Sequence, residues 1–106
     1  MCNSCEEMYV PYHIHSSLSN PTCGTKADCV TNYDLYLEKA KEMGIRAFGF
    51  SEHGNILNHV KKKEAIEKAG MKYIHGVEAY LTENIVKGEL KRDNYHWVMI
   101  AKNYDG

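Results

Sequence analysis

Two histidines, His13 and His15, end a short apolar segment, and their spacing is the first feature of this 106-residue sequence that could do chemistry. In a β-strand, side chains two positions apart point to the same side, so both imidazoles are predicted on one face. Imidazole nitrogen is a common ligand of zinc, iron and manganese. The pair fits a metal site. It also fits two ordinary strand histidines, one hydrogen-bonded and one solvated. Candidate ligands in other segments of the chain are needed to distinguish these two interpretations.

Three further candidate ligands come from separate segments of the chain. They are His53, Glu78 and His96. His59 is predicted to be a surface residue on a helix. His75 precedes Gly76 in a strand, and by alternation it points away from Glu78, so it is expected to pack or to form a hydrogen bond.

The elements that must position these residues alternate between strand and helix patterns. Strands are predicted over residues 9–15, 45–50, 72–77 and 95–101, and helices over 31–43 and 56–69. Gly44 and Gly70 supply the helix stops. The order predicts an α/β fold with parallel strands, right-handed crossovers and helices outside the sheet.

In a parallel α/β sheet the carboxyl ends of the strands meet at one rim, where active sites form. His13 and His15 fall at the end of the first strand, His53 just past the second, and Glu78 just past the third. His96 comes from a fourth segment and could join them. This convergence predicts a metal centre more specifically than any one segment does.

Composition and charge limit the classes of function that fit this chain. Hydrophobic residues make up 43% and charged residues 25% of the chain, as in ordinary soluble domains, and the net charge of −1 does not indicate a nucleic-acid binder. No apolar run reaches membrane-spanning length, and residues 1–8 lack the apolar centre of a signal peptide. We therefore expect a cytoplasmic protein with no membrane partner. The run Lys61–Lys63 is expected to be a solvated helix face, with phosphate contact as the alternative.

The four cysteines are expected to be thiols. They are Cys2, Cys5, Cys23 and Cys29. A zinc site built from all four, or a redox pair at Cys2 and Cys5, is the alternative. Residues 1–8 are predicted to be a flexible segment, and residues 82–94 a charged surface loop or hairpin.

Four sequence blocks in order resemble the PHP (polymerase and histidinol phosphatase) family. They are His-x-His-Ser at 13–16, Ser-Glu-His-Gly-Asn at 51–55, Gly-Val-Glu-Ala-Tyr at 76–80, and His96 followed by Trp-Val-Met-Ile-Ala-Lys-Asn. The likeness covers about residues 9–106 and is most specific to the PHP domain found at the N-terminus of bacterial DNA polymerase III α subunits.

The resemblance implies a fold, a cofactor and an activity. The family's fold is a distorted (βα)7 barrel that holds two or three Zn, Mn or Fe ions, and residues 9–106 would be a partial PHP domain, its N-terminal half. The metal ligands implied are His13, His15, His53, Glu78 and His96, the first four of them catalytic. The implied activity is phosphoester hydrolysis, with 3′–5′ exonuclease action on DNA, in a larger replicative polymerase chain. The 106 residues alone are expected to be inactive.

The sequence also departs from the family pattern. The family carries an acid or histidine eight or nine residues after the first histidine, where this chain has Pro21 and Thr22, and it carries Asp where this chain has Glu52. Its later ligands would lie beyond position 106. An eroded PHP domain that braces a polymerase, or a stand-alone PHP phosphatase, therefore remains as an alternative.

Overall fold

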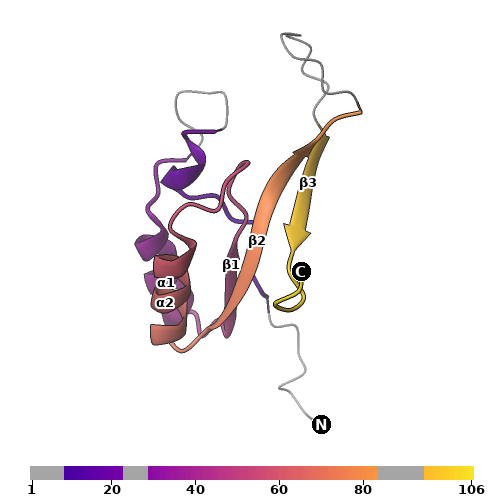
Figure 1. Ribbon diagram of the computed structural model, residues 1–106. Coiled ribbons are helices and arrows are strands. Elements are labelled where there is room, and N and C mark those ends of the chain that lie inside the picture. Colours follow the sequence, from indigo (N-terminus) through magenta and orange to yellow (C-terminus); the bar gives the residue numbers. More distant parts are fainter. Residues whose placement is uncertain (1–8, 23–28, 84–94) are drawn as a thin grey trace.

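The computed structural model describes residues 9–22, 29–83 and 95–106. The predicted flexible segment 1–8 lies outside them. The elements in chain order are η2 (Ser17–Ser19), α1 (Tyr33–Glu42), β1 (Ala47–Phe50), α2 (His59–Lys68), β2 (Lys72–Leu81) and β3 (Tyr95–Ile100). Figure 1 shows both α-helices on one side of the sheet, near β1, and β3 at the far edge. The predicted α/β class is confirmed.

A small apolar core lies between the helices and the sheet. Phe48 and Phe50 are two apart in β1, so they project from the same face, and their ring centroids are 4.9 Å apart. The other buried members are Leu37 and Ala40 of α1, Ile66 of α2, and Met71. This packing occupies the helix side of the sheet.

The third strand corrects the predicted topology. β2 pairs with β1 in parallel but with β3 antiparallel, so the prediction that all strands run parallel is wrong for β3. An antiparallel neighbour needs no crossover helix. The first residues of β3 therefore lie beside the last residues of β2, and His96 pairs with Tyr80. The predicted loop or hairpin at 82–94 falls almost wholly outside the described residues.

Residues 9–15 do not form the predicted continuous strand. The segment makes one isolated parallel bridge, between Ile14 and Phe50, and belongs to no strand. Pro11 is buried and has no amide hydrogen to give to a ladder. His13 lies in a bend. Proline and the bend explain why a β-prone sequence here remains irregular.

One extra residue is inserted where this segment meets β1. The amides of Gly49 and Ser51, two positions apart, donate to the carbonyls of Pro11 and Ile14, three positions apart, at 2.8 and 2.9 Å. The carbonyl of Tyr12, which the insertion displaces from the ladder, accepts from Ser51 Oγ at 2.5 Å. This is the geometry of a β-bulge, a device that re-aims neighbouring side chains.

Several predicted boundaries move. α1 begins at Tyr33 rather than at 31, and α2 begins at His59 rather than at 56 because Asn58 before it adopts a left-handed conformation with φ of 56°. β2 extends to Leu81, since it pairs with β3 over that length. Glu78 therefore lies inside a strand rather than just past it.

The lysine run on α2 is only in part a solvated face. Lys61 and Lys63 are exposed as predicted, but Lys62 is buried, with 3% of its surface exposed. Within the described ranges, no helix is both long and apolar enough to cross a membrane.

Candidate metal centre

The Glu78 carboxylate lies at the centre of the candidate site. It is 3% exposed, and it projects from the face of β2 opposite to the helices. An isolated parallel bridge joins Glu78 to His53, made by Glu78 N–H to the Glu52 carbonyl at 3.0 Å and Gly54 N–H to the Glu78 carbonyl at 2.8 Å. Residues paired in register project from the same face, so His53 and Glu78 lie together.

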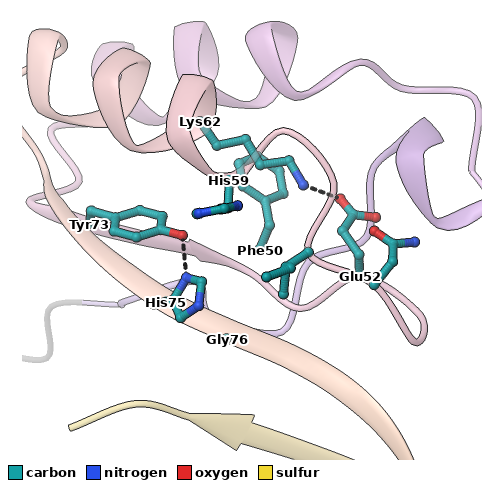
Figure 2. A pocket seen from close by; sticks show the side chains of 9 residues that line it. Phe50, Glu52, His59, Lys62, Tyr73, His75 and Gly76 are labelled. Atoms are coloured by element: carbon teal, nitrogen blue, oxygen red, sulfur yellow. Dashed lines mark hydrogen bonds and ion pairs between the residues drawn. The ribbon is translucent and has the colours of Figure 1, made fainter. Parts of the chain in front are cut away.

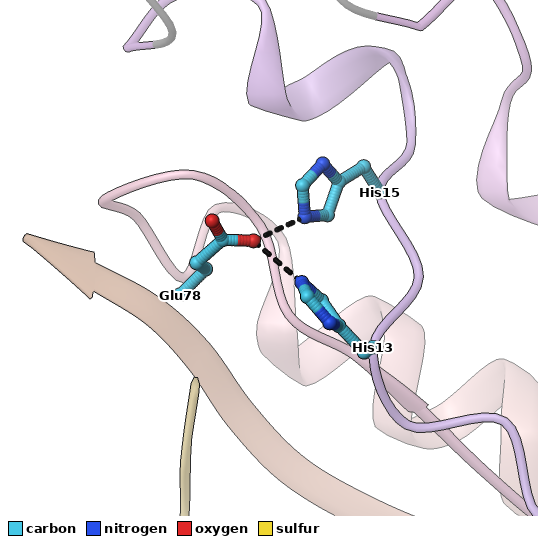
Figure 3. A group of neighbouring side chains, drawn as sticks. All are labelled: His13, His15 and Glu78. Carbon is cyan, nitrogen blue, oxygen red and sulfur yellow. Dashed lines mark hydrogen bonds and ion pairs between the residues drawn. The ribbon is translucent and has the colours of Figure 1, made fainter. Parts of the chain in front are cut away.

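One carboxylate oxygen receives the two histidines of the first segment. His13 Nε2 lies 2.6 Å and His15 Nε2 2.7 Å from Glu78 Oε2. Figure 3 shows both imidazoles directed at this one oxygen. An ionised carboxylate only accepts hydrogen bonds, so each imidazole donates its N–H in this arrangement. The predicted common face for the pair is thus reached although the segment is bulged rather than a regular strand.

The other carboxylate oxygen faces the second histidine pair. His96 Nδ1 lies 2.6 Å and His53 Nδ1 3.7 Å from Glu78 Oε1. His53 is buried, while the side chain of His96 is 54% exposed. The antiparallel course of β3 brings His96 here, because it places the start of β3 beside the end of β2.

Three of these imidazoles, those of His13, His15 and His53, change the acidity of the carboxylate. Burial alone would raise the pKa of Glu78, but hydrogen bonds from His13 and His15 and the electrostatic attraction of His53 outweigh it and lower that pKa to about 2. Glu78 is therefore an anion throughout the neutral range. A lasting negative charge among imidazoles is an arrangement suited to a cation.

The donor set fits divalent transition metals. Two groups, His13–His15–Glu78 and His53–Glu78–His96, each hold three ligand atoms within 4.8 Å of one another. Ligands about 2.1 Å from a shared zinc ion stand up to about 4 Å apart, so these spacings need little change. Nitrogen and carboxylate oxygen suit Zn²⁺, Mn²⁺ or Fe²⁺ better than Ca²⁺. A bound metal ion would take the place of the imidazole protons that are donated to Glu78.

Glu52 does not join the centre, although it is adjacent to His53. Neighbouring residues in an extended chain point to opposite faces, and Glu52 projects to the helix side, where its carboxylate meets Lys62 Nζ at 3.2 Å. From the sequence, Glu52 was only a substitution within a motif, and its buried partners were not predicted. The available signal was the alternation of side chains along an extended chain, which predicts that Glu52 points away from the face that carries His53.

The positions where the resemblance implied a third ligand are occupied by residues of another kind. Pro21 and Thr22 belong to neither group of candidate ligands. The Thr22 hydroxyl donates to the carbonyl of His53, and Asn55 Nδ2 donates to Thr22 Oγ1 at 3.0 Å. Thr22 therefore braces the backbone behind His53.

The remaining predicted roles have mixed outcomes. His59 is exposed, and His75 Nδ1 hydrogen-bonds the Tyr73 hydroxyl at 2.6 Å; both agree with prediction. Cys29 is a free thiol whose Sγ lies 3.5 Å from the Tyr36 hydroxyl. The other three cysteines lie outside the described residues, so the four-thiolate zinc site stays a prediction.

Comparison with known proteins gives a family match over most of the chain. The model of the PHP domain family matches residues 11–106. DNA polymerase III subunit alpha of Aquifex aeolicus is 33% identical over 92% of this chain and 9% of that protein. The corresponding subunit of Borreliella burgdorferi is 29% identical over 90% of this chain and 8% of its own length.

A second type of polymerase also matches. The DNA polymerase III PolC-type protein of Thermotoga maritima is 33% identical over 72% of this chain and 5% of that protein. The chain therefore spans less than a tenth of the length of these curated relatives.

Proposed function

We propose that this chain, which belongs to the PHP domain family, supplies part of a metal-dependent phosphoesterase site in a DNA polymerase III α-like protein. The observation that carries the proposal is the shared carboxylate: Glu78 holds one histidine pair on Oε2 and another on Oε1. A carboxylate that bridges two nitrogen-rich groups is suited to two neighbouring cations.

The residues have distinct roles in this proposal. His13 and His15 hold one ion, His53 and His96 hold the second, and Glu78 is shared. When bound, such ions supply Lewis acidity to a phosphoryl oxygen and to water. The chain's own contribution is to fix the ligand spacing and to keep Glu78 ionised through its lowered pKa. The metal identity we expect is zinc, manganese or iron.

The substrate we propose is DNA, cleaved from the 3′ end. The similar proteins named above are DNA polymerase III alpha subunits and a PolC-type DNA polymerase III, and a DNA polymerase acts at the 3′ end of a DNA strand. The remainder of the polymerase chain would be the physical partner of this domain. A positive protein surface is not required, since the ions would supply the positive field at the substrate phosphate.

The test compares His15→Ala with His59→Ala in the full-length protein. His15 contacts Glu78, whereas His59 is an exposed histidine on α2 and serves as the matched control. With Mn²⁺ or Zn²⁺, we expect hydrolysis of 3′-terminal nucleotides by the wild type and by His59→Ala, and loss of most of this activity in His15→Ala. Equal turnover of all three proteins would refute the proposed function.

We further propose that residues 9–106 form the N-terminal half of a PHP barrel. In support, β3 pairs with β2 along one side only among the described residues, and its large apolar side chains are exposed: Trp97 58%, Met99 56% and Ile100 45%. Exposed apolar side chains at a sheet edge are suited to further strands and helices. A stable, soluble monomer formed by residues 9–106 alone would contradict this.

The alternative function is a structural brace with an incomplete site. The observation that favours it is Thr22, which is bonded to the His53 carbonyl at a position where the family pattern has a ligand. In that case the wild-type protein would bind fewer than two ions and would not hydrolyse DNA, yet disruption of the domain would still impair the polymerase. Metal content per chain separates the two functions.

A further inference from the structure

A second buried carboxylate, Glu52, lies on the helix side of the sheet, 1% exposed. Ser16 N–H donates to both of its oxygens, at 3.0 and 3.1 Å, and the Ser16 hydroxyl donates to Oε1. Ser19 Oγ donates to Oε2 at 2.5 Å, and Lys62 Nζ donates to Oε1 at 3.2 Å. Figure 2 shows Lys62 reaching Glu52 from α2. These donors fill the acceptor sites of the carboxylate.

Every donor to Glu52 is tied to a ligand of the candidate metal centre or to the helix behind it. Ser16 follows His15 directly in the chain. Ser19 Oγ also accepts from His53 N–H at 3.0 Å, so one hydroxyl links the Glu52 carboxylate to the His53 backbone. The Glu52 carbonyl accepts from Glu78 N–H at 3.0 Å. Through short links, Glu52 thus holds His15, His53 and Glu78.

Lys62 supplies the opposite charge for this carboxylate. Its Nζ lies 5.1 Å from the centroid of the Phe50 ring, so it is held over an aromatic face of the core. The Lys62 side chain is 4% exposed and that of Glu52 is 1% exposed. Loss of either partner of a buried charge pair is strongly destabilising, because the other charge is left buried without a counter-charge. The two side chains are therefore held in a single arrangement.

We propose that Glu52 and Lys62 form a positioning pair that fixes His15 and His53 at the spacing a metal ion requires. The pair does not touch the metal or the substrate; it acts through Ser16 and Ser19. The inference rests on the proposed function, because the histidines must be ligands for their spacing to matter. It extends that function by giving a role to a residue that lies next to a ligand but faces the other way.

A merely structural pair would stabilise the fold without setting ligand spacing, and a double variant separates the two roles. Glu52→Leu with Lys62→Met replaces both charges with apolar groups of similar size, which often leaves stability unchanged or raised. It also removes the carboxylate that accepts from the Ser16 amide and from the hydroxyls of Ser16 and Ser19. If the pair positions the ligands, metal affinity falls although the fold is kept.

The experiment uses the full-length protein, stripped of metal and titrated with Mn²⁺. The variants are Glu52→Gln and the double variant, with Glu67→Gln as the matched control, since Glu67 pairs with Lys63 on the exposed face of α2. Hydrogen exchange of α2 reports the fold, and the visible spectrum of the Co²⁺-loaded protein reports ligand geometry.

We expect Glu52→Gln and the double variant to bind Mn²⁺ at least about tenfold more weakly than the wild type, in the range typical when support of metal ligands is lost. The Co²⁺ spectrum should change in both, and Glu67→Gln should match the wild type. A double variant with native protection, native affinity and a native Co²⁺ spectrum would overturn the positioning role alone. A wild-type protein that binds none of Mn²⁺, Zn²⁺ and Fe²⁺ would overturn the proposed function, and this inference with it.

Discussion

Glu78 and Glu52 are both buried carboxylates, yet their surroundings differ in kind. Glu78, on the open face of the sheet, is contacted by nitrogen atoms of four histidines. Glu52, on the helix side, is contacted by an amide, two hydroxyls and the Lys62 ammonium. Imidazole can exchange its proton for a metal ion, whereas amides, hydroxyls and a charged lysine cannot do so readily.

The comparison shows that burial of an acid does not by itself indicate a functional site. The groups that contact the buried carboxylate determine whether it can serve as a metal site. A carboxylate whose acceptor sites are filled by fixed donors holds backbone segments together, and one surrounded by imidazoles is prepared for a cation. In this chain the two kinds lie on opposite faces of one sheet, and the backbone of 52–53 connects them.

The largest effect should come from Glu78→Gln. This change leaves the shape of the side chain but removes the charge that both ligand groups share. We expect DNA hydrolysis by the full-length protein to fall to below about a hundredth of the wild-type rate, because both ions depend on that anion. The measurement is Mn²⁺-dependent release of 3′-terminal nucleotides, with bound metal counted in the same samples. Full metal content in this variant would show that the ions do not depend on the Glu78 charge.

Lys62→Met should destabilise the α2 region strongly. It leaves the buried Glu52 charge without its ammonium, a loss that typically costs about 3–5 kcal/mol. Lys63→Met is the matched control on the same helix, where the exposed pair with Glu67 is worth at most about 1 kcal/mol. Native-state hydrogen exchange of α2 in the full-length protein measures both. Similar losses in the two variants would show that Lys62 is not the partner of a buried charge.

The two histidine pairs should separate by metal count. His13→Ala removes a ligand from the group on Oε2, and His96→Ala removes one from the group on Oε1, and both side chains are about half exposed. We expect each variant to lose one ion and to keep the other, because the substitution leaves one group with only two of its three ligands while the second group keeps all three. Metal analysis per chain tests this. Loss of all metal in both variants would indicate a single shared ion.

The smallest effect should be a dependence of stability on acid. The pKa of Glu78 is about 2 in the folded chain against an ordinary 4.5, so the unfolded chain takes up a proton first as pH falls. The stabilising contribution is therefore present above 4.5 and is lost as pH falls through about 2. In metal-free protein, the difference in thermal stability between wild type and Glu78→Gln should shrink between about pH 5 and pH 3. A difference that grows in acid would contradict the assigned pKa direction.

The family, the α/β class and the set of candidate ligands could be predicted from the residues alone. Four blocks of chemically distinctive residues were enough for the first, and the helix and strand periods of 3.6 and 2 were enough for the second. His13, His15, His53 and Glu78 were chosen because imidazole and carboxylate bind metals and these residues lie at or just past predicted strand ends, and His96 was added from a fourth segment. The structure brings all five together.

Three features of the fold could not be predicted from local sequence patterns. These features are the bulge at Tyr12, the antiparallel course of β3 and the burial of Lys62. Each depends on which distant segment packs alongside. A local pattern predicts that a lysine within a run of lysines is solvated. Glu52 and Glu78 are both glutamates and both are buried. Their local sequence does not distinguish which charged groups surround each carboxylate. Only packing did so, because it placed serines and a lysine around one carboxylate and histidines around the other.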